Sequence, residues 1–218
     1  MNGTVEGDGQ SWLTSFEARL LRLAPDLARR LGEGIRLLEL SCEKVHVLTY
    51  LARRFSNSVF IGIDFSQEAI DAARREVAQQ GLENVTFRLQ NLGDFDTRAE
   101  PESYDAITAF CGFYDQARPL NVLSGIHRAL RSDGVYIMQG IRGSREVHEN
   151  VVQACGTPPH NVSCIQDMMV SSALNGAALS TMWGEQKTRD FLWHAGFRSI
   201  ETYKMPEDIT NNWYVVRK

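Results

Sequence analysis

Residues 35–66 read IRLLELSCEKVHVLTYLARRFSNSVFIGIDFS, and this stretch decides the fold class. Two apolar runs, residues 35–40 and 59–63, flank a segment with helical spacing over residues 44–55. A buried strand, a helix and a second buried strand in this order are typical of a parallel βαβ unit.

The same alternation continues towards the C-terminus. Ser66 is a good helix cap and Gly81 a good helix stop, so a helix is expected between them. Further strands are expected at residues 84–89, 104–110, 135–139, 198–203 and 212–217, with helices at 118–130 and 185–194. The short link 204–211 favours an antiparallel hairpin. The pattern predicts an α/β fold with a seven-stranded, mostly parallel sheet that ends in this hairpin.

Two segments lie outside this alternation. Residues 1–34 are predicted as an N-terminal helical segment, with a helix over 11–31 that Pro25 breaks, and residues 35–218 as the main domain. Residues 142–182 contain no expected strand and several glycines and prolines. Such a long insertion usually covers a site, so it is predicted to be a helical lid.

Composition restricts the partners. The chain of 218 residues has a formal net charge of −4, so it lacks the basic field that binds nucleic acid. No signal peptide or run of about 18 apolar residues is visible, which favours a soluble cytoplasmic protein without a membrane partner. The four cysteines form no C-x-x-C pair, and no metal site is expected.

Five stretches together resemble one family. They are LLELSCEKV at 37–45, FIGIDFS at 60–66, NVTFRLQNLGDF at 84–95, YDAITAFCGFYDQARP at 104–119 and ALRSDGVYIMQ at 129–139. In this order they resemble the motifs of class I S-adenosylmethionine (SAM)-dependent methyltransferases, which have a Rossmann-like fold. The sequence STMWGEQ at 180–186 resembles a subgroup of small-molecule methyltransferases.

The resemblance implies a set of cofactor residues. They are Glu39, Ser41, Asp64, Asn91, Leu92 and Phe110. A carboxylate at Asp64 would accept hydrogen bonds from both ribose hydroxyls, although a helix cap beside Ser66 is the alternative. The amide oxygen of Asn91 would accept a hydrogen bond from the adenine amino group, and a plain turn residue is the alternative.

The resemblance also implies residues on the side of the methyl acceptor. Tyr114 and Asp115 stand where the family faces the transferred methyl group, so they are the candidate catalytic residues. A pocket aromatic and a helix cap are the alternative interpretation. Met168, Met169, Met182 and Trp183 in or beside the insertion suit an adaptable apolar substrate pocket, or pack the lid onto the sheet.

The glycine-rich SAM loop of the family is altered in this chain. Ser41, Glu43 and Val45 occupy the glycine positions. Glu43 would repel the carboxylate of SAM by about 4 kcal/mol at a separation of about 4 Å. A positive φ is unfavourable for Val45, so either the loop takes another path or the next helix begins earlier. Weakened SAM binding is therefore predicted.

Three functions are compatible with the sequence. The first is a SAM-dependent methyltransferase acting on a small, largely apolar metabolite. The second is a methyltransferase fold reused for cyclisation or isomerisation of a small molecule, with weak or no SAM binding. The third is a non-catalytic partner subunit. The sequence sets no oligomeric state.

Overall fold

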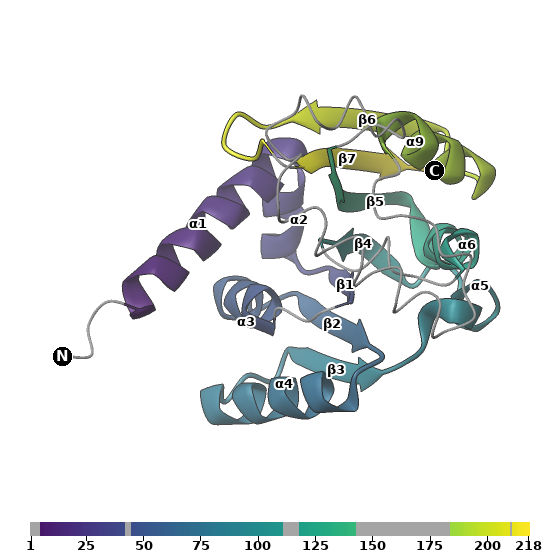
Figure 1. Ribbon diagram of the computed structural model, residues 1–218. Helices are drawn as coiled ribbons and strands as arrows, with labels where there is room; N and C mark the ends of the chain where they lie inside the picture. The colour runs from purple at the N-terminus through teal and green to yellow at the C-terminus, as the bar shows by residue number, and fades with distance from the viewer. Residues whose placement is uncertain (1–4, 42–44, 111–117, 143–183, 210) are drawn as a thin grey trace. The chain divides into compact units, whose positions relative to one another are not determined.

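The computed structural model describes residues 5–41, 45–110, 118–142, 184–209 and 211–218 (Figure 1). The chain divides into two compact units, Met1–Leu89 and Gln90–Lys218. None of the helices in these described ranges is long and apolar enough to cross a membrane.

In the part of the first unit that the structure describes, there are three parallel strands and four helices. In chain order they are α1 (Val5–Leu23), α2 (Leu27–Glu33), β1 (Arg36–Leu40), α3 (Val45–Arg54), β2 (Val59–Asp64), α4 (Gln67–Gln80) and β3 (Val85–Leu89). The strand order is β3-β2-β1, and both pairings are parallel. The predicted βαβ unit is therefore confirmed.

Local signals fix the ends of α4 as the sequence predicts. The Ser66 hydroxyl accepts a hydrogen bond from the Ala69 N–H at 3.2 Å, which satisfies one of the free donors at the start of the helix. Gly81 ends the helix with a left-handed φ of 63°, a conformation that glycine adopts without steric cost.

The predicted N-terminal helix is divided between α1 and α2. The interruption surrounds Pro25, which has no N–H to continue the hydrogen-bond ladder, and α1 begins earlier than expected, at Val5. The Tyr50 hydroxyl on α3 donates a hydrogen bond of 2.6 Å to Glu17 Oε2 on α1. This hydrogen bond raises the pKa of Tyr50 and ties the two helices together.

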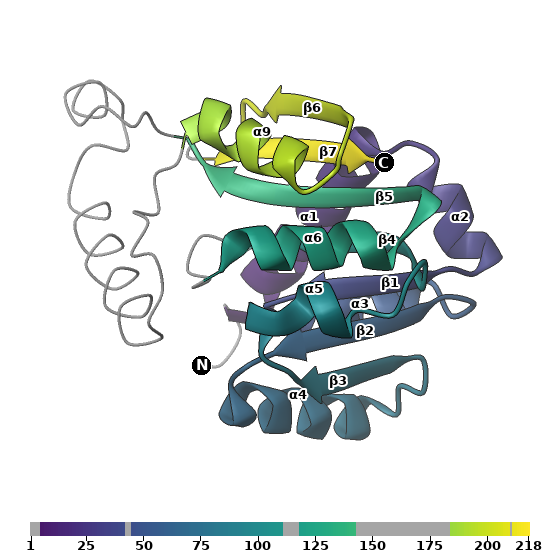
Figure 2. The same cartoon turned by 90° about the vertical axis from the view of Figure 1, so that its right-hand side faces the viewer.

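The described residues of the second unit form four strands. In chain order its elements are η1 (Leu92–Asp94), α5 (Phe95–Arg98), β4 (Tyr104–Ala109), α6 (Pro119–Ala129), β5 (Leu130–Ile141), α9 (Gly184–His194), β6 (Ser199–Lys204) and β7 (Asn211–Arg217). The strand order is β4-β5-β7-β6. β4 pairs parallel with β5, whereas β7 pairs antiparallel with both β5 and β6. Helices α6 and α9 lie on one face of these strands (Figure 2).

The second unit departs from the sequence prediction at β5. The predicted turn at residues 132–134 lies inside the strand, because Leu130 already pairs with Tyr104 before the register jumps to Val135 opposite Ala106. Burial of Leu130 and the 2.7 Å bond from Arg131 to Asp105 hold this early pairing in place. The short elements η1 and α5 were not expected, since three or four residues carry no readable period.

The predicted fold class is confirmed. Seven strands, mostly parallel and ending in an antiparallel hairpin, alternate with helices in a Rossmann-like α/β fold. Both units bury continuous apolar strands, as parallel sheets require. The largest fully buried side chains include Phe60 in the first unit, and Tyr136, Phe197, Trp213 and Tyr214 in the second. The predicted lid, apart from Arg142, lies outside the described residues.

Candidate functional site

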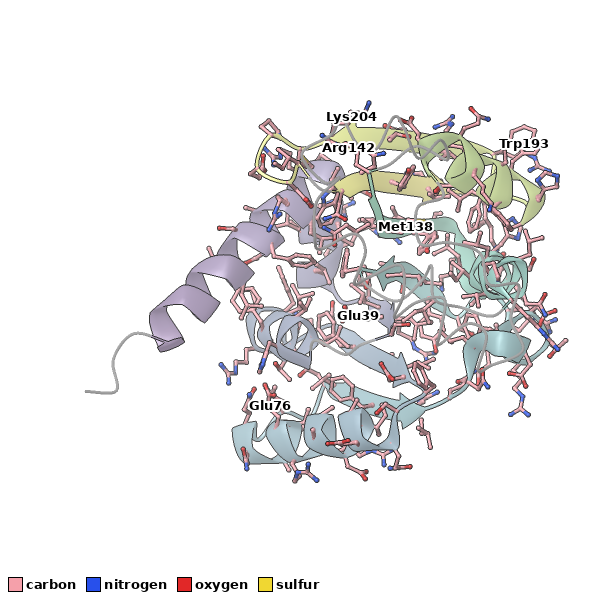
Figure 3. All side chains as sticks on the ribbon, viewed as in Figure 1. Glu39, Glu76, Met138, Arg142, Trp193 and Lys204 are labelled. Atoms are coloured by element: carbon pink, nitrogen blue, oxygen red, sulfur yellow. The ribbon has the colours of Figure 1, made fainter. Side chains whose placement is uncertain are left out.

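The first unit places two carboxylates at the carboxyl ends of neighbouring parallel strands. Glu39 is the fourth residue of β1 and is 3% exposed, and Asp64 ends β2 and is 5% exposed. Glu39 pairs with Gly62, two residues before Asp64, so both side chains project from the same face of the sheet. Figure 3 labels Glu39 in this position. In open α/β sheets, ligands bind at this edge of the strands.

Asp64 is held in place by the backbone of the turn that follows it. Its Oδ1 accepts a hydrogen bond from the Ser66 N–H at 2.8 Å. The ribose-binding and helix-start interpretations of Asp64 are therefore compatible, because Ser66 caps α4 with its own hydroxyl and Asp64 orients the preceding turn. A buried, oriented carboxylate at this edge is suited to accepting hydrogen bonds from a diol.

Two exposed apolar side chains flank Asp64, and the sequence analysis did not identify them. Phe65 directly follows Asp64 and is 61% exposed, and Leu89 pairs with Asp64 in the register of β2 with β3 and is 48% exposed. An exposed aromatic ring beside a buried carboxylate is suited to packing against a planar base. The sequence does contain a signal for Phe65: an aromatic residue stands between the end of a strand and a helix cap, a position where burial is not expected.

The altered loop retains a glycine-like conformation at its first position. Ser41 has φ of 56°, in the left-handed region that normally favours glycine. Val45 is the first residue of α3, and its φ is not among the positive values found in the described residues. Residues 42–44, which carry the path of the loop before Val45, lie outside the described residues. Glu43 lies outside the described residues.

The second unit holds the other predicted cofactor residues. Asn91 is exposed and caps η1, because its Oδ1 accepts a hydrogen bond from the Gly93 N–H at 2.8 Å. The amide oxygen of Asn91 therefore serves the turn. Leu92 is 5% exposed and belongs to the core. Phe110 follows β4, is partly exposed, and its ring centroid lies 5.7 Å from that of Trp213.

The remaining predicted site residues cannot be placed in this arrangement. Tyr114, Asp115, Met168, Met169, Met182 and Trp183 lie outside the described residues. Within the part of the chain that the structure describes, no three His, Cys, Asp or Glu side chains are grouped so as to hold a metal ion.

The fold and the carboxylate that ends β2 define an α/β protein with a candidate nucleoside site at the carboxyl edge of its strands. Comparison with known proteins makes the class more specific. The methyltransferase-domain family matches residues 31–192, which is most of the chain. The chain therefore belongs to this family, and the resemblance to class I SAM-dependent methyltransferases is confirmed.

Two curated relatives are similar to part of the chain. Phthiotriol/phenolphthiotriol dimycocerosates methyltransferase 1 of Mycobacterium ulcerans (strain Agy99) is 26% identical over 130 residues, covering 60% of this chain and 46% of that protein. The ubiquinone biosynthesis O-methyltransferase of Actinobacillus pleuropneumoniae serotype 7 (strain AP76) is 25% identical over 122 residues, covering 55% and 51%. The chain spans about half the length of the curated relatives it matches.

A solved structure supports the fold over most of the chain. A SAM-dependent methyltransferase from Aquifex aeolicus superposes with a TM-score of 0.61, covering 94% of this chain and 96% of that chain at 16% sequence identity. At this identity the likeness shows the fold.

Proposed function

We propose that this protein is a SAM-dependent methyltransferase whose acceptor is a small, largely apolar metabolite. The observation that carries the proposal is Asp64, a carboxylate that is 5% exposed and ends β2 in a fold of the methyltransferase family. Two ribose hydroxyls would donate to its two oxygens, and the bond from Ser66 N–H already fixes its orientation.

The surroundings of Asp64 fit the rest of an adenosine group. Phe65 and Leu89 offer apolar surface on which the adenine ring would pack. Gly62, beside Glu39 in the sheet, adds no side chain at this edge. The left-handed backbone of Ser41 retains at one position the conformation that glycine would supply in the loop after β1.

In this proposal the chain contributes position rather than covalent chemistry. When bound, SAM would supply an electrophilic methyl group, to which the acceptor atom would form a bond in line as the C–S bond breaks and S-adenosylhomocysteine leaves. Asp64 would hold the ribose and Phe65 the base, so that the methyl group lies at a fixed position relative to the acceptor. The binding free energy of SAM would then offset the entropic cost of aligning the two reactants. Tyr114 and Asp115 remain the predicted residues on the acceptor side, and Asn91, Leu92 and Phe110 remain predicted cofactor contacts.

An apolar acceptor is supported by two features. The insertion contributes Met168, Met169 and Met182, and Trp183 directly follows it; these residue types suit an adaptable apolar pocket. The names of the two curated relatives, which concern dimycocerosates and ubiquinone, also favour an apolar molecule over a peptide or nucleic acid.

A transfer assay tests the proposal. The wild-type protein and the Asp64→Ala variant are incubated with methyl-labelled SAM and an organic-solvent extract of metabolites from the source cells. The proposal predicts label in the organic phase with the wild type and at least about tenfold less with the variant. Equal label from both proteins would contradict the role of Asp64 in holding SAM. No label from a wild type that binds SAM would contradict methyl transfer and favour a reused fold.

A further inference from the structure

A second buried carboxylate, Asp208, lies in the turn between β6 and β7 and is 8% exposed. Its Oδ2 accepts hydrogen bonds from Gln139 Nε2 at 2.7 Å and from Trp213 Nε1 at 2.8 Å. Its Oδ1 accepts one from Asn211 Nδ2 at 2.9 Å. A buried carboxylate is costly unless such donors surround it, so the three donors stabilise both the charge and the turn.

Trp213 connects this carboxylate to an aromatic residue at the end of β4. The indole is fully buried, its N–H points to Asp208, and its ring packs against Phe110 with an angle of 48° between the ring planes. Phe110 itself is partly exposed. The Phe110 ring is therefore in contact with an indole that is itself hydrogen-bonded to Asp208.

The guanidinium of Arg142 acts as a clamp that links the end of β5 to the start of β7. Arg142, directly after β5, donates from Nε to Asn212 Oδ1 and from Nη2 to the Asn211 carbonyl, both at 3.2 Å. Figure 3 labels Arg142 at the end of β5 and Lys204 at the end of β6. The clamp joins β5 to β7 at the carboxyl edge of the parallel pair β4 and β5, where ligands of α/β proteins bind.

We propose that Asp208 is a positioning residue of the ligand site, which holds the Phe110 ring in its binding orientation through Trp213. The inference rests on the proposed function, because it takes Phe110 to be a ligand contact. It adds to that function a residue about 100 positions away in the chain that touches no ligand itself.

Calorimetric titration with S-adenosylhomocysteine tests the inference against a matched control. Asp208→Ala and Trp213→Phe are each expected to raise the Kd about tenfold. The double variant should raise it no more than the stronger single one, because both substitutions remove the same Trp213–Asp208 hydrogen bond. Asp208→Asn keeps an acceptor for the indole and should recover most of the affinity.

Asp105 provides the control. It is 7% exposed and bonded to Arg131 at 2.7 Å, but it stands at the start of β4, at the opposite edge. Asp105→Ala is expected to lower the melting temperature without changing the Kd. Equal Kd changes in Asp105→Ala and Asp208→Ala, or unchanged Kd in Asp208→Ala, would overturn the inference.

A second readout needs no ligand. With 4-fluorophenylalanine at position 110, the ¹⁹F resonance should shift or broaden in Asp208→Ala and Trp213→Phe and stay unchanged in Asp105→Ala. An unmoved resonance in Asp208→Ala would overturn the link to Phe110. A wild type that does not bind S-adenosylhomocysteine would instead refute the proposed function, and the ¹⁹F spectra would still decide whether Asp208 positions Phe110.

Discussion

Replacing Asp64 by alanine is expected to remove most of the affinity for S-adenosylhomocysteine. The carboxylate is 5% exposed, and its position at the end of β2 directs it to the proposed ribose. Each hydrogen bond from a hydroxyl to a charged acceptor contributes about 1.5–3 kcal/mol. Two such bonds at the lower limit amount to about 3 kcal/mol, which corresponds to a Kd roughly 150-fold higher.

The same substitution also has a structural cost, which has to be separated from binding. The bond from the Ser66 N–H to Asp64 Oδ1 is lost, at about 1 kcal/mol of folding free energy. For a chain of this size that lowers the melting temperature by about 2–4 °C. Ser66→Ala is the matched control. Loss of the Ser66 cap on the Ala69 N–H lowers the folding free energy by a similar amount, about 1 kcal/mol, and leaves the Asp64 carboxylate in place.

Isothermal titration calorimetry with S-adenosylhomocysteine on the wild type and both variants separates the loss of binding from the loss of folding stability. The reasoning requires a large rise in Kd for Asp64→Ala and a change of less than about twofold for Ser66→Ala. If both variants lose the same affinity, the effect is on the fold of the turn, and the assignment of the ribose to Asp64 is wrong.

Three further predictions concern stability, and thermal denaturation checks each of them. Gly125→Ala should destabilise the protein by about 1–3 kcal/mol, because the added Cβ would lie 2.5 Å from Cδ1 of Phe95, whereas Gly32→Ala, with no atom within 4 Å, should not destabilise it. Burial lowers the pKa of His127 below its ordinary value of 6.5, so the unfolded chain takes up a proton at a higher pH than the folded protein does. The folding free energy that neutral His127 contributes is therefore present above pH 6.5 and is lost as the pH falls through the lowered pKa. His127→Gln should lose less stability than the wild type between pH 7.5 and 5.5. Ser41→Gly should leave the free energy of unfolding unchanged or raise it by up to about 1 kcal/mol. Glycine removes the steric strain of the positive φ at position 41, and this gain outweighs the added freedom of the unfolded chain. A clear decrease in stability would contradict this reasoning.

The elements that the sequence predicted well are those encoded locally. Ser66 and Gly81 fix α4 through contacts within the helix itself, and the apolar runs of β1 and β2 mark buried parallel strands. The early start of β5 was missed because it depends on the distant pairing of Leu130 with Tyr104, which no local pattern reveals.

In the candidate site, too, locally encoded residues were predicted and residues that depend on distant packing were missed. Asp64 was identified because a strand end followed by a helix cap is a local pattern, and the resemblance gave that position a role. Phe65 was missed because its exposure depends on the packing around it. Asp208 was missed because its donors Gln139 and Trp213 come together only through the pairing of β5 with β7.

The most direct test of the account is a crystal structure of the protein grown with a saturating concentration of S-adenosylhomocysteine. The account predicts that both ribose hydroxyls lie within hydrogen-bond distance of the Asp64 carboxylate, with the adenine packed on Phe65. A ligand bound elsewhere, or no ligand at the end of β2 at that concentration, would contradict the proposed SAM site.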